Sequence, residues 1–255
     1  MEKLDFLIEY LLRERNEKLE INSLSYNDKK RIFRSLCNIR EAKKSLSKEF
    51  LKIQDEYLQE ELEIKGVVEN IESSKISDVI YLWKGDITTL KIEAIVNAAN
   101  SQGLGCFIPC HKCIDNAIHS ASGIELRLEC DKKMKEIGRL ETGKAFITKG
   151  YNLPSKYVIH TVGPIVYNGV TKKEIEELKN CYINSLKLAK ENNIKEIAFC
   201  CISTGEFRFP EVDASKIAIK TVNECIEQNG GYFQKIVFNV FTDEDYNIYL
   251  KNFGE

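Results

Sequence analysis

The sequence of 255 residues lacks a hydrophobic run long enough to cross a membrane. A membrane-spanning helix needs about 20 apolar residues in succession. The first residues, MEKLDFLIEYLLRERNEK, are charged throughout and have no apolar centre of the kind that a signal peptide carries. We therefore expect a cytoplasmic protein that makes no membrane contact.

An excess of charge of either sign is also absent. The chain has 37 Lys and Arg against 39 Asp and Glu, a net charge of -2. Proteins that bind nucleic acid through a broad surface carry a strongly basic face, so nucleic acid is not an expected partner. Recognition of one nucleotide in a local pocket stays compatible with this charge.

Proline and glycine are absent from residues 1–65, where apolar residues recur at helical spacing. Leu4, Leu7 and Ile8 belong to this pattern, and Ser25 can cap the start of a further helix. We predict that residues 1–75 form a helical extension and residues 76–255 the main domain. The extension either packs as a structural layer or docks a partner; the size and moderate charge of the whole chain predict a monomer.

The main domain contains short, nearly continuous apolar runs that predict strands buried on both faces. Helical stretches separate them, and this alternation predicts an α/β/α sandwich around a mostly parallel, mixed sheet. The predicted strands lie at residues 79–83, 94–97, 145–148, 157–162, 196–202 and 235–241. The predicted helices lie at about residues 113–136, 172–192, 212–228 and 243–252.

Three loops that follow predicted strands carry the residues expected of a binding site, because ligands of open α/β sheets bind beyond the carboxyl ends of the strands. The first is GDIT (residues 85–88), the second VNAAN (96–100), and the third begins with the STG of residues 203–205. Successive N–H groups in the third loop can hold a diphosphate. Taken alone, each loop would more often be an ordinary turn.

The nine cysteines cluster at one place only, in CFIPCHKC at residues 106–113. This stretch also holds one of the three histidines of the chain. Cysteine thiolate and histidine nitrogen are the usual ligands of zinc, and a catalytic zinc keeps one coordination position open. A cluster that releases its metal on oxidation is the redox-sensing alternative. Outside the cluster, we predict that His119 packs or caps within its helix and that His160 packs in the interior.

Taken together, GDIT, VNAAN, AIH (117–119), HTVGP (160–164) and the STG loop resemble the macrodomain family, the ADP-ribose-binding α/β/α module. CFIPCHKC replaces the short glycine-rich stretch of ordinary hydrolytic macrodomains and resembles the zinc-containing subfamily of ADP-ribosylhydrolases. That subfamily has an N-terminal helical extension, which QDEYLQEEL at residues 54–62 resembles. The resemblance covers nearly the whole chain.

The resemblance implies one Zn²⁺ per chain, bound by Cys106, His111 and Cys113 in a C-x4-H-x-C spacing. Cys110 is left out because it follows a proline and its sequence neighbour is His111, and adjacent side chains usually diverge; with Cys110 the site would be closed and structural. Asp115 matches the catalytic aspartate of hydrolytic members, and Asn100 is expected to orient the distal ribose. The resemblance also implies that Asp86 and Ile87 contact the adenine and that Phe207 borders the proximal ribose. The diphosphate contacts that it implies are Ser203, Thr204, Gly205 and Glu206.

The implied activity is removal of mono-ADP-ribose from protein side chains by cleavage of a glycosidic or ester bond. The resemblance also implies two partners, a lipoyl-carrier protein and a sirtuin-like ADP-ribosyltransferase. Two alternatives stay open. One is an ADP-ribose-binding reader with a structural zinc, and the other is a zinc-stabilised interaction module.

Overall fold

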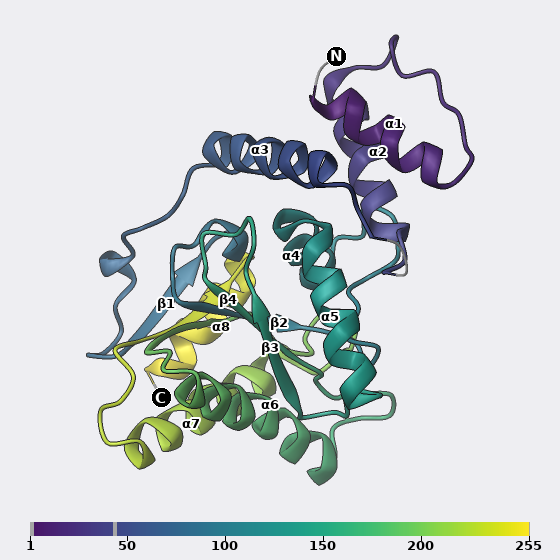
Figure 1. The fold of residues 1–255 in the computed structure, drawn as a ribbon. Helices are drawn as coiled ribbons and strands as arrows, with labels where there is room; N and C mark the ends of the chain where they lie inside the picture. Colours follow the sequence, from purple (N-terminus) through teal and green to yellow (C-terminus); the bar gives the residue numbers. More distant parts are fainter. Residues whose placement is uncertain (1–2, 43–44, 255) are drawn as a thin grey trace.

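The computed structural model describes residues 3–42 and 45–254. Its first part consists of three helices that sit at one end of the molecule, beside the sheet domain (Figure 1). Ser25 caps the second helix by accepting the backbone N–H of Asp28 at 3.2 Å, as predicted. The helices enclose a core of their own, which includes Leu7, Ile8 and Phe50. The helices are α1 (Lys3–Glu14), α2 (Tyr26–Ile39) and α3 (Lys48–Lys65).

The sheet has six strands in the order β1-β6-β5-β2-β4-β3, and only β3 runs antiparallel to its neighbour. The prediction of a mostly parallel, mixed sheet is therefore confirmed. Ile95, Ile197 and Val237, from the central strands, have no exposed surface. The strands are β1 (Ile80–Lys84), β2 (Ala94–Ala98), β3 (Ala145–Lys149), β4 (Tyr157–Thr161), β5 (Glu196–Phe199) and β6 (Lys235–Val240).

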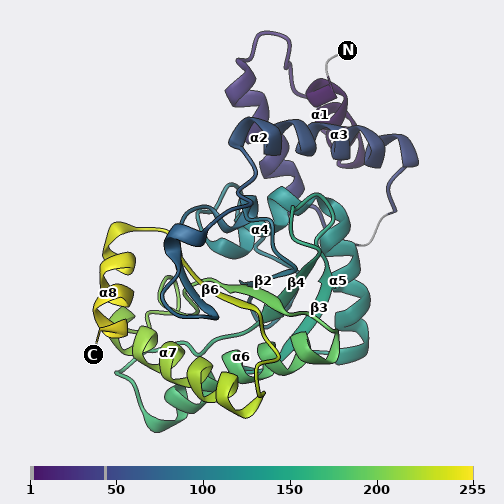
Figure 2. The same cartoon turned by 90° about the vertical axis from the view of Figure 1, so that its left-hand side faces the viewer.

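Helices cover both faces of this sheet and complete the three predicted layers (Figures 1 and 2). Two helices form one layer, α4 (Ile114–Ser122) and α5 (Ile124–Ile137). The other layer consists of α6 (Lys172–Glu191), α7 (Glu211–Gln228) and α8 (Asp243–Phe253). Two short 3-10 turns, η1 (Glu72–Ser74) and η2 (Ile87–Thr89), flank β1. Among the described residues, no helix combines the length and apolar character that crossing a bilayer requires.

Two predicted elements are several residues longer than the observed ones. The helix expected over residues 113–136 is broken at Gly123, whose φ of +97° lies in the range that favours glycine. A Cβ there would lie 2.8 Å from Nε2 of Gln54, so α3 packs directly on the break. The strand expected over 196–202 ends at Phe199, because the chain leaves the sheet there to form the STG loop.

Candidate functional site

The three predicted binding loops lie at one edge of the sheet, since each follows the carboxyl end of a parallel strand. Strand β2 lies beside β5, so the VNAAN and STG loops are neighbours. Strand β1 lies beside β6, and the backbone N–H of Gly85 donates to the Val240 carbonyl at 3.0 Å. The edge therefore offers a continuous row of loops, with the GDIT loop at one end.

Asp86 is held as an acceptor at the start of η2. Its Oδ1 accepts hydrogen bonds from the backbone N–H and the hydroxyl of Thr88, at 3.0 and 2.6 Å. Its Oδ2 accepts from Nζ of Lys65, the last residue of α3, at 3.1 Å. Burial raises the pKa of Asp86, but the Thr88 bonds and the Lys65 charge outweigh it, so the net pKa is lowered. The carboxylate is thus ionised at neutral pH, while neighbouring Ile87 has its side chain in the core.

Asp115 lies buried in the first turn of α4, only 4% exposed. Nδ2 of Asn97, at the end of β2, donates to its Oδ1 at 2.7 Å, and Nδ2 of Asn100 is 3.4 Å from its Oδ2. Burial raises the pKa of Asp115 to about 6, against the opposing effects of Asn97 and the Arg127 charge. The structure therefore brings both predicted catalytic side chains together. The bond from Asn97 was not predicted, although its place at the polar end of a buried strand was a signal.

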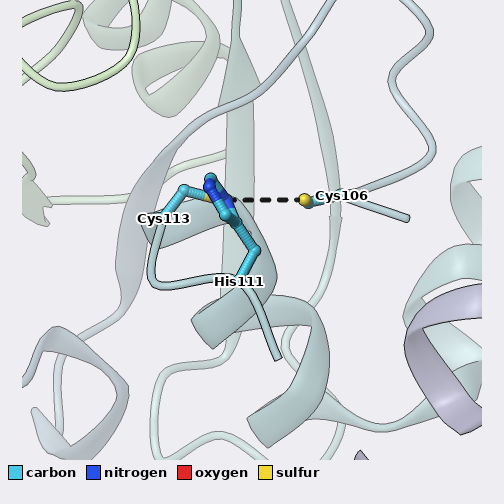
Figure 3. A group of neighbouring side chains, drawn as sticks. All are labelled: Cys106, His111 and Cys113. Atoms are coloured by element: carbon cyan, nitrogen blue, oxygen red, sulfur yellow. Dashed lines mark hydrogen bonds between the residues drawn. The ribbon is translucent and has the colours of Figure 1, made fainter. Parts of the chain in front are cut away.

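Cys106, His111 and Cys113 converge, with their potential ligand atoms all within 4.8 Å of one another. Figure 3 shows the Cys106 thiol directed at the His111 ring, with 3.8 Å between Sγ and Nδ1. Two thiols and an imidazole suit zinc, and ligand atoms around a tetrahedral zinc lie about 3.5–3.8 Å apart. These residues fit the ion. Sγ of Cys113 also accepts the backbone N–H of Asn116 at 3.4 Å, so one candidate ligand caps α4.

Cys110 points away from this cluster and toward helix α2. Its Sγ lies 3.2 Å from Oγ of Ser35 and 3.4 Å from the carbonyl of Arg31. Its φ is +51°, in the left-handed region. Adjacent side chains therefore diverge here, and Cys110 is not part of the three-residue cluster.

Glu206 links the STG loop to the cluster. Its Oε1 lies 3.4 Å from Nε2 of His111. A carboxylate at the second nitrogen of a histidine ligand fixes the tautomer and the ring orientation. The sequence predicted a backbone role for Glu206 at a diphosphate, and the side-chain contact with His111 was missed because it joins residues 95 positions apart.

The STG loop has the form of an anion-binding turn. Ser203 is buried with φ +68°, and Phe207 is half-buried with its carbonyl accepting the N–H of Val166 at 2.9 Å. No described residue accepts a hydrogen bond from the backbone N–H groups of residues 203–207. This run includes Thr204, Gly205 and Glu206. Free consecutive N–H groups provide partial positive charge for a phosphate.

Two further side chains define the surroundings. His160 is fully buried, with Nδ1 3.1 Å from Nδ2 of Asn97 and Nε2 2.9 Å from the Thr148 hydroxyl, and His119 is 5% exposed. Both histidines are therefore interior residues, as predicted for His160. Phe241 is 74% exposed directly after β6, beside the GDIT loop. The sequence analysis assigned Phe241 to the buried strand over residues 235–241, but β6 ends at Val240.

Three comparisons show what the chain is similar to. A family model described as Macro domain matches residues 96–218. A Treponema medium protein named protein-ADP-ribose hydrolase is 48% identical over 252 residues, covering 96% of each chain. A Staphylococcus aureus protein of the same name is 44% identical over 256 residues, covering 99% of this chain and 95% of that one. The crystal structure of the Trypanosoma brucei macrodomain in complex with ADP-ribose superposes with a TM-score of 0.65 at 31% identity, covering 82% of this chain and 92% of that one.

Proposed function

The chain belongs to the macrodomain family, and from this premise we propose that it is a zinc-dependent protein-ADP-ribose hydrolase. It is a hydrolase that binds ADP-ribose and releases it from modified proteins, in keeping with the names of its relatives. The finer proposal is that the reaction depends on one Zn²⁺ bound by Cys106, His111 and Cys113. The observation that carries it is the convergence of these three ligands while Cys110 faces α2, which leaves a coordination position open.

The row of loops suits ADP-ribose from end to end. The ionised Asp86 accepts a hydrogen bond from the adenine amino group, and the backbone of Ile87 assists. Phe241 offers an exposed aromatic face on which the adenine can stack. The N–H groups of residues 203–207 hold the diphosphate, and Phe207 borders the proximal ribose.

At the other end, the side chains of the VNAAN loop and α4 meet the distal ribose. Asn100 orients this ribose, and Asp115 accepts the proton of the attacking water or positions that water. The hydrogen bond from Asn97 occupies Oδ1 of Asp115, and Nδ2 of Asn100 lies 3.4 Å from Oδ2, which links the two side chains proposed to act on this ribose. When bound, zinc supplies Lewis-acid polarisation of a substrate oxygen or a water of lowered pKa.

The cysteine loop, residues 106–113, offers both a test variant and a control variant for zinc dependence. Cys106→Ala removes a ligand and is expected to abolish release from a mono-ADP-ribosylated protein while the dissociation constant for free ADP-ribose changes by less than about threefold. The last part follows because the adenine and diphosphate contacts lie on other loops. Cys110→Ala, in the same loop, is expected to keep both zinc and turnover.

Each alternative has its own result in this experiment. Release at the wild-type rate by Cys106→Ala would refute catalytic zinc. Loss of folding in Cys106→Ala would favour a structural zinc. Tight binding without release by the wild-type protein would indicate a reader, and absence of ADP-ribose binding would indicate an interaction module.

The subfamily resemblance extends the proposal to partners and compartment. We propose as carrier a lipoyl-carrier protein that a sirtuin-like ADP-ribosyltransferase has modified. A comparison of release rates from that carrier and from an unrelated modified protein tests this assignment. All nine cysteines are unpaired, which suits the reducing cytoplasm that we propose as the compartment.

A further inference from the structure

The loop that carries the three ligands has no regular structure of its own. Residues 106–113 form neither helix nor strand, and Cys110 within it has a left-handed φ of +51°. A side chain with a Cβ adopts this conformation at a cost, so surrounding contacts must impose it. These contacts come largely from α2 of the N-terminal extension.

Arg34 of α2 fixes the part of the loop that contains His111. Its Nη2 donates to the carbonyl of His111 at 3.1 Å, and its Nε and Nη2 donate to Oδ1 of Asn116 at 3.1 and 2.6 Å. Asn116 is fully buried and passes this contact on, since its Nδ2 donates to the Ile108 carbonyl at 3.0 Å. Arg34 thus positions the loop on both sides of Cys110.

Asn38, one turn further along α2, fixes Cys110 itself. The Asn38 side chain is 1% exposed, and its Oδ1 accepts the backbone N–H of Cys110 at 2.9 Å. Its Nδ2 donates to the hydroxyl of Ser120 on α4 at 3.1 Å, which anchors the amide. The left-handed conformation of Cys110 is therefore fixed by the buried Asn38 side chain, which is itself anchored to α4.

Arg127 of α5 joins the end of α2 to the beginning of the loop. Its guanidinium donates to the carbonyls of Leu104 and Cys106, at 2.7 and 3.2 Å. The same group donates to three carbonyls at and just beyond the C-terminal end of α2, where backbone acceptors have no partner in the helix. These acceptors belong to Cys37, Asn38 and Arg40.

From these contacts we propose that α2 is a brace that sets the shape of the metal-ligand loop, and thereby how tightly the loop holds its ion. The inference rests on the zinc site of the proposed function and goes beyond it, because it gives the N-terminal extension a task in the site. Arg34 and Asn38 touch neither substrate nor metal ligand atoms and are positioning residues.

Helix α2 supplies a matched pair of variants. Arg34→Gln removes the bonds to His111 and Asn116, whereas Arg31→Gln changes an exposed arginine whose side chain makes no hydrogen bond or ion pair with the described residues. Zinc affinity is measured by competition with a chromogenic chelator. We expect at least tenfold weaker zinc binding in Arg34→Gln, as for the loss of other outer contacts of metal ligands. The affinity for ADP-ribose stays within about twofold, because its contacts are on other loops.

A second measurement does not depend on zinc. Hydrogen exchange of residues 106–113 is compared in the metal-free proteins, and faster exchange is expected in Arg34→Gln and unchanged exchange in Arg31→Gln. Asn38→Ala, which frees the N–H of Cys110, is expected to behave as Arg34→Gln does and serves in its place if that variant does not fold.

The outcomes separate the brace from the proposed function. If the wild-type protein binds no zinc, the zinc proposal fails, together with the effect of the brace on the ion. If it binds zinc and Arg34→Gln binds zinc equally well, the brace is overturned and the zinc site stands. Faster hydrogen exchange in Arg34→Gln with unchanged zinc affinity also overturns the claim that α2 determines how tightly the loop binds the ion.

Discussion

Gly163, which follows β4, packs against the start of the STG loop so closely that there is no room for a side chain. A Cβ at this position would lie 1.9 Å from Oγ of Ser203 and 2.8 Å from Cγ2 of Ile202. Separations of this size do not occur between unbonded atoms, so Gly163→Ala forces the Ser203 hydroxyl to move by about 1 Å or more. The displacement falls at the start of the run of N–H groups proposed to hold the diphosphate.

Overpacking of this kind costs about 1–3 kcal/mol. We expect Gly163→Ala to lower the free energy of unfolding by about that amount, measured by urea denaturation. Because about 1.4 kcal/mol corresponds to a factor of ten in affinity, a loop displaced from its ligand should bind ADP-ribose about tenfold more weakly or worse. Isothermal titration calorimetry measures this change.

Ser203→Gly provides the internal control. It deletes the nearer of the two atoms that the new methyl group strikes, leaving Cγ2 of Ile202 at 2.8 Å, and it places glycine where φ is +68°. Oγ of Ser203 is buried with no hydrogen-bond partner among the described residues, so its loss should cost little. We expect Ser203→Gly alone to bind ADP-ribose as the wild type does, and the double variant to regain most of the affinity that Gly163→Ala loses. Wild-type binding by Gly163→Ala, or no recovery in the double variant, would refute the reasoning.

Two further predictions concern the site and its core. Phe241→Ala should leave the free energy of unfolding unchanged, because the ring is 74% exposed, and should weaken ADP-ribose binding by about 1–3 kcal/mol if the ring stacks on the adenine; equal affinity by calorimetry would remove Phe241 from the site. Burial lowers the pKa of His160 to about 3. Below about pH 6.5 the unfolded chain therefore binds a proton at this residue that the folded chain does not bind, so the free energy of unfolding decreases as the pH is lowered from about 6.5 to 3. From pH 8 to pH 5 this residue should cost about 2 kcal/mol, and urea denaturation of His160→Gln at both pH values should show a smaller loss than the wild type; equal losses would contradict the assignment of His160 as a buried neutral base.

The arrangement of the sheet domain could be predicted because its strands are nearly continuous apolar runs and its polar loops follow their ends. The same rule predicted that Asp86 and Asn100 lie at one edge of the sheet. The boundaries depended on tertiary contacts instead. Gly123 lies within residues 113–136, but nothing in that stretch indicates that α3 places Gln54 against it, where an added Cβ would lie 2.8 Å from Nε2.

The metal-binding chemistry of residues 106–113 could be predicted from the sequence because metal ligands recur at short spacings. The contacts that hold this loop in place could not be predicted, because they join segments that are distant in the sequence. Arg34 contacts the carbonyl of His111 across 77 positions, and Glu206 contacts the same histidine across 95. Arg34 belongs to no local pattern that distinguishes it from other charged residues, and the STG loop predicted only a backbone role for Glu206. The role of the extension in the site therefore follows only from the folded structure.

The most direct test of zinc-dependent hydrolysis uses the wild-type protein with its zinc content measured. It is incubated with a mono-ADP-ribosylated protein, with and without a strong chelator, and released ADP-ribose is quantified while circular dichroism monitors the fold. The account predicts about one zinc per chain and release that the chelator abolishes without unfolding the protein. Release that is indifferent to the chelator, or binding of ADP-ribose without any release, would contradict it.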